Sequence, residues 1–263
     1  MRSCRFPGGR GRGGGQVVDA RRVVAGALLA VATVVALAVS VAVQALQSVP
    51  AAATSSTGAA TLYRDALATT RSWSVHYASN STESKQTLME TGNAGPASAS
   101  QTVVLGAGSI SILVIGGISY VKGNAEGLES LAGLSSSQAA EAAGQWIEFS
   151  TTNTAFAPVV EGVRSTDLAK ELALKAPLTL GHARTLNGQA VDAIDGTQAF
   201  GKKSEHVVLY VRAKGTHVPV EEDSVDSKGK HTDAEHIVYS HWGERVRPEA
   251  PKATISVGSI SAV

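Results

Sequence analysis

The chain has almost no cysteine and few aromatic residues. Its single cysteine, Cys4, lies close to the N-terminus, so the rest of the chain contains neither a disulfide nor a thiolate metal site. Only 5% of the residues are aromatic, and only four of the 263 are phenylalanine. The interior must therefore be built mainly from aliphatic and small side chains, which fill a wide space poorly.

Signatures of the common enzyme classes are also missing. The sequence has no Gly-x-Ser-x-Gly nucleophile elbow, and the pair Gly106 and Gly108 lacks the third glycine and the following helix of a dinucleotide fingerprint. We therefore expect neither an enzyme nor a bound cofactor.

Metal-ligating patterns are weak as well. His231, His236 and His241 are five residues apart, which on one strand puts neighbours on opposite faces. Together with Asp233 and Glu235 they leave two interpretations open, a weak surface cation site or a solvated strand edge. We expect the solvated edge and no metal site. The acidic run 221–223 is likewise expected to be a solvated face beside a charged turn.

The N-terminus is strongly basic. Residues 1–22 contain six arginines and one acid, Asp19, which leaves 17 basic against 21 acidic residues in the remainder. Because that remainder is mildly acidic, nucleic acid is not expected as a partner. The basic segment is expected to be a cytoplasmic tail.

One long apolar run, residues 23–46, follows the pair Arg21 and Arg22. As a helix it would be about 36 Å long, enough to cross a hydrocarbon core of about 30 Å. The positive flank stays in the cytoplasm, so the C-terminal part is expected outside the cell membrane. Two outcomes stay open, an uncleaved signal-anchor, which we favour, or secretion after cleavage near Ala53. Residues 47–58 are expected to be a linker and residues 59–263 one extracytoplasmic domain.

The pattern within that domain predicts the α+β class with one large antiparallel sheet. Short, consecutive strands separated by glycine are typical of an antiparallel meander. Helices are expected at 59–67, around 128–132, from Ser135 to Gly144, and from Ser165 towards Pro177. About ten strands are expected, at 73–77, 101–105, 109–115, 118–121, 146–149, 178–186, 189–195, 206–213, 218–225 and 232–242, with Asn187-Gly188 as a hairpin turn.

Several short segments recur in an order that resembles a known family. They are residues 119–124, 143–147, 209–211, 218–220 and 239–244, the last followed by Pro248 and Pro251. This order resembles actinobacterial lipoproteins of the LppX/LprG type in the LolA-like lipoprotein-carrier superfamily. The resemblance implies a strongly curved antiparallel sheet, an incomplete barrel closed by helices, with an apolar hollow for acyl chains. The chain departs from that pattern at 49–51, where Val-Pro-Ala replaces the lipidated cysteine.

Two alternative functions are expected from these observations. The first is a membrane-tethered lipid-binding or lipid-carrier module, with an apolar cavity between sheet and helices and a lipid or acyl chain as ligand. Its expected lining is Val103, Leu105, Ile110, Ile112, Val114, Leu128, Leu131, Leu168 and Leu172. The second is a cell-envelope interaction or scaffold domain with a solid core and no ligand.

Overall fold

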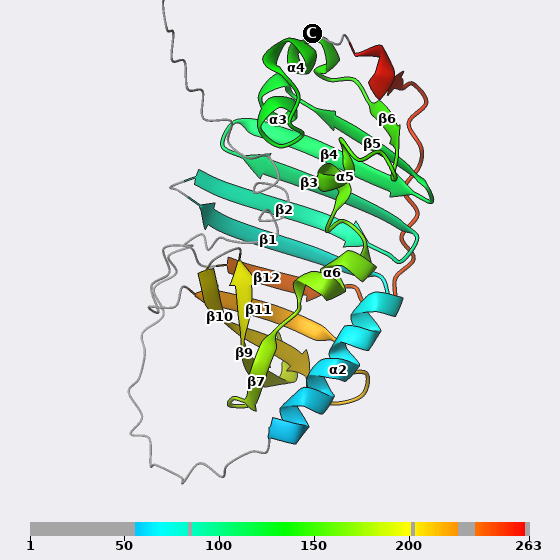
Figure 1. Cartoon of the computed structure of the whole chain (residues 1–263). Helices are drawn as coiled ribbons and strands as arrows, with labels where there is room; N and C mark the ends of the chain where they lie inside the picture. The colour runs from blue at the N-terminus through cyan, green and yellow to red at the C-terminus, as the bar shows by residue number, and fades with distance from the viewer. Residues whose placement is uncertain (1–55, 84–85, 201–202, 226–234, 261–263) are drawn as a thin grey trace, which may run out of the picture.

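The protein is described from a computed structural model that covers residues 56–83, 86–200, 203–225 and 235–260. This part of the chain forms one 13-stranded sheet with short helices (Figure 1). The strands are β1 Val75–Glu83, β2 Gln86–Ala94, β3 Ser98–Leu105, β4 Gly108–Ile115, β5 Ile118–Gly123, β6 Ile147–Ser150, β7 Lys175–Leu180, β8 Arg184–Leu186, β9 Gln189–Phe200, β10 Lys203–Arg212, β11 Pro219–Val225, β12 Glu235–Ser240 and β13 Ile255–Ser256.

The sheet is an open antiparallel meander in two halves. Its order is β13-β6-β5-β4-β3-β2-β1-β12-β11-β10-β9-β7, and β8 pairs with β9. β1 joins the halves, because it pairs with β2 on one side and with β12 on the other. The short parallel pair of β13 and β6 is the exception to the antiparallel pattern. The predicted α+β class with a large antiparallel sheet is therefore confirmed.

The helices all pack on one face of this sheet, which we call the inner face (Figure 1). They are α2 Ser56–Ser72, α3 Ala125–Ser130, α4 Ser136–Ala142, α5 Ala157–Val160 and α6 Ser165–Glu171. α2 is the longest, and it begins at Ser56, within the range expected to be a linker. It packs beside α6 and β7. The other four helices have at most seven residues each.

The predicted basic tail at 1–22 and the predicted membrane segment at 23–46 lie outside the described residues. Within the part of the chain that is described, no helix combines the length and the apolar character needed to cross a membrane.

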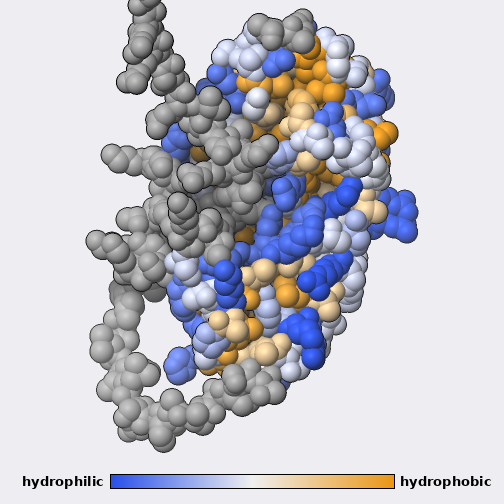
Figure 2. All heavy atoms as spheres, viewed as in Figure 1, coloured by the Kyte–Doolittle hydropathy of each residue, from blue (hydrophilic) through white to orange (hydrophobic). Residues whose placement is uncertain are grey.

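Two apolar clusters divide the inner face. One lies beneath α3, α4 and α5 against β3–β6, and the other lies beneath α2 and α6 against β1, β7, β9, β10 and β12. Figure 2 shows the outer surface of this side, with apolar patches towards each end of the visible face and a hydrophilic region between them. The apolar residues of the inner face therefore form two separate clusters and not one continuous core.

Candidate ligand-binding face

The cluster beneath α3, α4 and α5 contains most of the predicted ligand contacts. Val103, Ile110, Ile112, Val114, Leu128 and Leu131 are buried in it, and Leu105 packs against it half-buried. Alternation along β4 causes this grouping, since every second side chain of 108–115 is buried on the inner face. The sequence therefore places these seven side chains together correctly, while their role in binding stays a prediction.

Leu168 and Leu172, the other two predicted contacts, lie elsewhere. Both are buried in the second cluster, beneath α2 and against β9 and β10. The apolar stripe of α6 was predicted correctly, but α6 covers the other half of the sheet. The nine residues thus form two groups, seven in one cluster and two in the other.

α3 is fixed to the sheet by one side chain and one glycine. The Asn124 side chain accepts hydrogen bonds from the backbone N–H groups of Gly127 at 2.8 Å and Ser109 at 3.0 Å, and donates to the Ala107 carbonyl at 2.7 Å. A Cβ atom at Gly127 would lie 2.2 Å from the Ser109 carbonyl oxygen, so only glycine allows this close approach. The predicted cap at Asn124 therefore also docks α3 on the turn between β3 and β4.

A band of buried polar side chains separates the two clusters. Ser79 of β1 pairs with Glu90 of β2 on one side and with Ile237 of β12 on the other. Ile237 in turn pairs with Glu222 of β11. Glu90 and Glu222 are 1% and 3% exposed. Alternation gives β1 and its neighbours further buried polar side chains on this face, namely Tyr77, Ser81, Gln101, Ser224, Glu235 and Tyr239. We call this set, together with Glu171 of α6, the polar band.

Burial raises the pKa values of three acids in the polar band, Glu90, Glu171 and Glu222. Desolvation raises the pKa of Glu90 to about 8, against the lowering effect of hydrogen bonds with Ser79 and Gln101. Desolvation likewise raises the pKa of Glu222 to about 7, against a hydrogen bond that the Tyr239 hydroxyl donates at 3.2 Å. The pKa of Glu171 is raised well above its ordinary value by desolvation first and by the charge of Glu90 next. These carboxyls therefore hold protons near neutral pH that exposed ones release.

The expected solvated face at 221–223 is thus wrong for Glu222. On an alternating strand, Glu221 and Asp223 point to the outer face and Glu222 points to the inner face, where it is buried. The inner face of a strand is normally recognised by its apolar residues. An acid between two other acids therefore gives no sequence signal that its side chain points inward.

The outer face brings Glu221, Asp223 and His236 together, with their ligand atoms within 4.8 Å of one another. His236 Nδ1 lies 2.8 Å from Asp223, and the Arg184 guanidinium lies 3.1 Å from Glu221 and 3.7 Å from Asp223. Arg184 also lies 3.6 Å from the ring centroid of Tyr210. The Arg184 guanidinium therefore balances part of the negative charge of Glu221 and Asp223. Of the residues considered for a cation site in the sequence, His231 and Asp233 lie outside the described residues.

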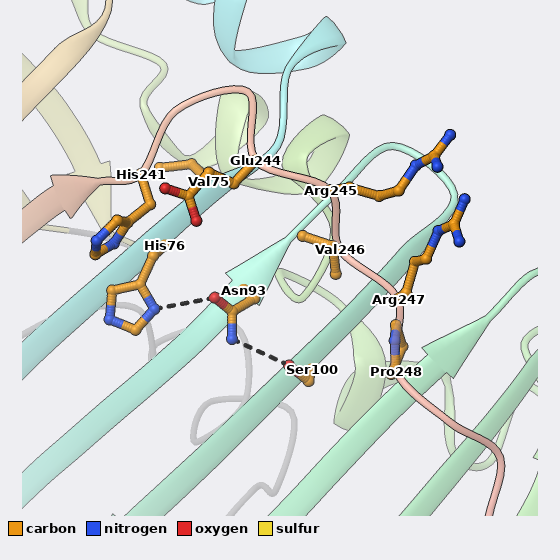
Figure 3. Close-up of a pocket in the computed structure, with 10 residues that line it drawn as sticks. All are labelled: Val75, His76, Asn93, Ser100, His241, Glu244, Arg245, Val246, Arg247 and Pro248. Carbon is orange, nitrogen blue, oxygen red and sulfur yellow. Dashed lines mark hydrogen bonds between the residues drawn. The ribbon is translucent and has the colours of Figure 1, made fainter.

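A polar pocket of about 290 Å³ lies at the ends of β1–β3, beneath the segment 241–248 (Figure 3). Its floor is a short hydrogen-bonded row in which His76 meets Asn93 at 3.1 Å and Asn93 donates to Ser100 at 3.5 Å. Arg245 and Arg247 extend away from this floor (Figure 3). The pocket is mainly hydrophilic, with Val75, Val246 and Pro248 as its apolar residues, and offers little apolar surface for a lipid.

The described chain is thus an open antiparallel sheet with one face covered by short helices and apolar in two places. It is similar to the solved structures of LprF from Mycobacterium bovis, with 15% identity, a TM-score of 0.49, and coverage of 76% of this chain and 99% of that chain. It is also similar to lipoprotein LppX from Mycobacterium tuberculosis, with 16% identity, a TM-score of 0.46, and coverage of 73% and 99%. A third similar structure is a putative outer membrane lipoprotein-sorting protein domain from Vibrio parahaemolyticus, with 9% identity, a TM-score of 0.30, and coverage of 72% and 92%.

The expected resemblance to LppX/LprG-type proteins is therefore found again among solved structures. No protein-family model matches the chain, and neither does any curated protein. At these identities and TM-scores the similarity concerns architecture alone, and the function is argued from this chain's own residues.

Proposed function

We propose that this protein is an extracytoplasmic lipid-binding or lipid-carrier module, tethered to the cell membrane by residues 23–46. In this proposal the sheet forms an incomplete barrel, and an acyl chain lies between its inner face and the cover of α3, α4 and α5. The observation that carries the proposal is the gathering of seven aliphatic side chains from β3, β4 and α3 beneath that cover. Secretion after cleavage near Ala53 would leave the same binding face in a soluble protein.

The cover is thin, which supports entry of a ligand. α3, α4 and α5 have six, seven and four residues, and helices of that length are not stable in water without tertiary packing. Contacts with the sheet therefore hold them in place, and an acyl chain that replaces those contacts restores the buried apolar surface. Each Å² of apolar surface buried against an acyl chain returns about 25 cal/mol, so a chain that buries a few hundred Å² gains several kcal/mol.

Photochemical labelling of the full chain tests this proposal. The full chain in dodecyl maltoside micelles is irradiated with a hexadecanol that carries a diazirine and an alkyne, and the labelled peptides are mapped by mass spectrometry. Lipid binding between sheet and helices predicts labels on peptides from β3, β4 and α3. Labels confined to residues 23–46 would instead support an interaction or scaffold domain with a solid core.

A pair of neighbouring substitutions provides the control. Val103→Phe adds bulk on the inner face of β3, and we expect it to reduce labelling about fivefold, equivalent to about 1 kcal/mol. Val104→Phe makes the same change on the outer face of the same strand, where Val104 is half-buried. It should leave the labelling unchanged. Equal labelling of both variants would contradict an inner-face site.

A further inference from the structure

The polar band carries oxygen atoms that are buried and have no hydrogen-bond partner. Tyr77 is 0% exposed and Glu90 is 1% exposed, yet the Tyr77 hydroxyl and Glu90 Oε2 are unpartnered. Oε2 of Glu171 and Oε1 of Gln198 are also buried without a partner. Leaving such a group unsatisfied costs about 1–3 kcal/mol, so several in one place favour a ligand that supplies hydrogen-bond donors.

Glu171 of α6 interacts with several of the residues that carry these atoms. The Tyr77 ring leans across β2, because a Cβ atom at Gly92 would lie 2.6 Å from the Tyr77 hydroxyl oxygen. The charges of Glu90 and Glu171 both raise the pKa of Tyr77, after desolvation. Tyr77 of β1, Glu90 of β2 and Glu171 of α6 therefore interact through the interior, and the Tyr77 hydroxyl points into the acidic cluster.

Near neutral pH the carboxyls of Glu90 and Glu171 hold protons while the site is empty, and a bound positive charge favours their ionised form. Among the described residues, every charged side chain that perturbs the pKa of Glu90, Glu171 or Glu222 is an acid. The unpartnered atoms of Glu90, Glu171 and Gln198 are acceptors when the carboxyls are ionised. An ammonium group provides three N–H donors and a positive charge, and both match this set.

We infer that the polar band binds the ammonium headgroup of a cationic amphiphile, with its alkyl chain along the apolar cluster beneath α3, α4 and α5. This inference rests on the proposed function for the alkyl part and adds the class of headgroup. One carboxylate from the sheet, Glu90, holds the ammonium from below, and Glu171 of α6 closes the site from above. The Tyr77 hydroxyl accepts one further N–H.

Competition among three amphiphiles of equal chain length tests the headgroup. Hexadecylamine, hexadecanol and hexadecyl sulfate each compete with the photoreactive hexadecanol on the full chain in micelles at pH 7. We expect hexadecylamine to displace the probe at a concentration about tenfold lower than hexadecanol, equivalent to about 1.4 kcal/mol, and hexadecyl sulfate to compete least.

Substitutions test which residues cause the preference for hexadecylamine. Glu90→Gln and Tyr77→Phe keep the shape of each side chain, and each should reduce the advantage of the amine to about threefold or less, a loss of about 0.7 kcal/mol. Glu141→Gln removes one negative charge from the exposed face of α4 and should retain the full advantage. Tryptophan emission verifies that each variant is folded. An amine preference that survives both Glu90→Gln and Tyr77→Phe would overturn the assignment of the site.

The two proposals fail in different ways. Equal competition by all three amphiphiles would overturn the ammonium site and leave lipid binding intact. Absence of labelling on the described residues, with no competition by any amphiphile, would overturn lipid binding itself and the ammonium site with it.

Discussion

Replacing Glu90 by glutamine should make the protein more stable at alkaline pH and change little at acidic pH. Glu90 has an ordinary pKa of 4.5, which burial raises to about 8 in the folded protein. Between these values the folded state keeps a proton that the unfolded chain releases, so rising pH favours unfolding. The stability lost through Glu90 accumulates from about pH 4.5 to about pH 8 and is constant above. At about 1.4 kcal/mol per pKa unit the loss approaches about 5 kcal/mol.

Urea unfolding measures this difference. All three tryptophans, Trp73, Trp146 and Trp242, lie in the described part of the chain, so their emission reports on this domain. With a urea m-value of about 2–3 kcal/mol/M, a gain of about 5 kcal/mol moves the midpoint of Glu90→Gln upward by about 2 M at pH 9. At pH 5 the two midpoints should differ by only about 0.3–0.4 M, because little of the loss has accumulated there. The charge of Glu90 also raises the pKa values of Glu171 and Tyr77, so its removal lowers both and adds to the gain of Glu90→Gln at pH 9.

The control for this experiment is Glu141→Gln, on the exposed face of α4, whose midpoint should follow the wild type at both pH values. A Glu90→Gln midpoint that shifts by the same amount at pH 5 and pH 9 would refute the reasoning, because it would mean that the substitution acts through packing and not through ionisation.

Three further outcomes follow from packing and charge. Gly127→Ala should destabilise by about 1–3 kcal/mol because its Cβ meets the backbone of β4, whereas Gly117→Ala, with no atom within 4 Å, should cost little in the same urea assay. Leu128→Ala, at a residue that is 0% exposed, should cost about 2–5 kcal/mol, and a cost below 1 kcal/mol would mean that its surroundings are not packed. Asp223→Asn should lower the pKa of His236, which the hydrogen bond with Asp223 raises, and NMR titration of the imidazole would contradict this if the pKa stayed constant.

Local signals in the sequence predicted local structure well. Ser135 forms the predicted capping box with Gln138. The pair Asn187 and Gly188 adopts positive φ angles of 48° and 78° in the turn between β8 and β9, as the hairpin signal requires. The cap of α6 was displaced by one residue. Arg164 is the N-cap, while Ser165 is the first helical residue and its hydroxyl is unpartnered.

The polar band escaped prediction because its signal is tertiary. β2 is a full strand, although only two of its residues are large and apolar, and its buried acid Glu90 is flanked by exposed Met89 and Thr91. Hydrophobic periodicity cannot identify an inward acid, because the same letters on a surface strand would face water. The separation of Leu168 and Leu172 from the other predicted contacts likewise depends on which half of the sheet α6 covers.

The pairing of β1 with β12 has a consequence for the order in which the chain folds. His76 is opposite Ser240, so the junction of the two halves connects segments separated by most of the domain. A growing polypeptide offers its N-terminal meander first, and that meander keeps one unsatisfied backbone edge until the last long strand arrives. Synthesis and emergence of the chain through β12 therefore have to precede closure of the sheet between its two halves.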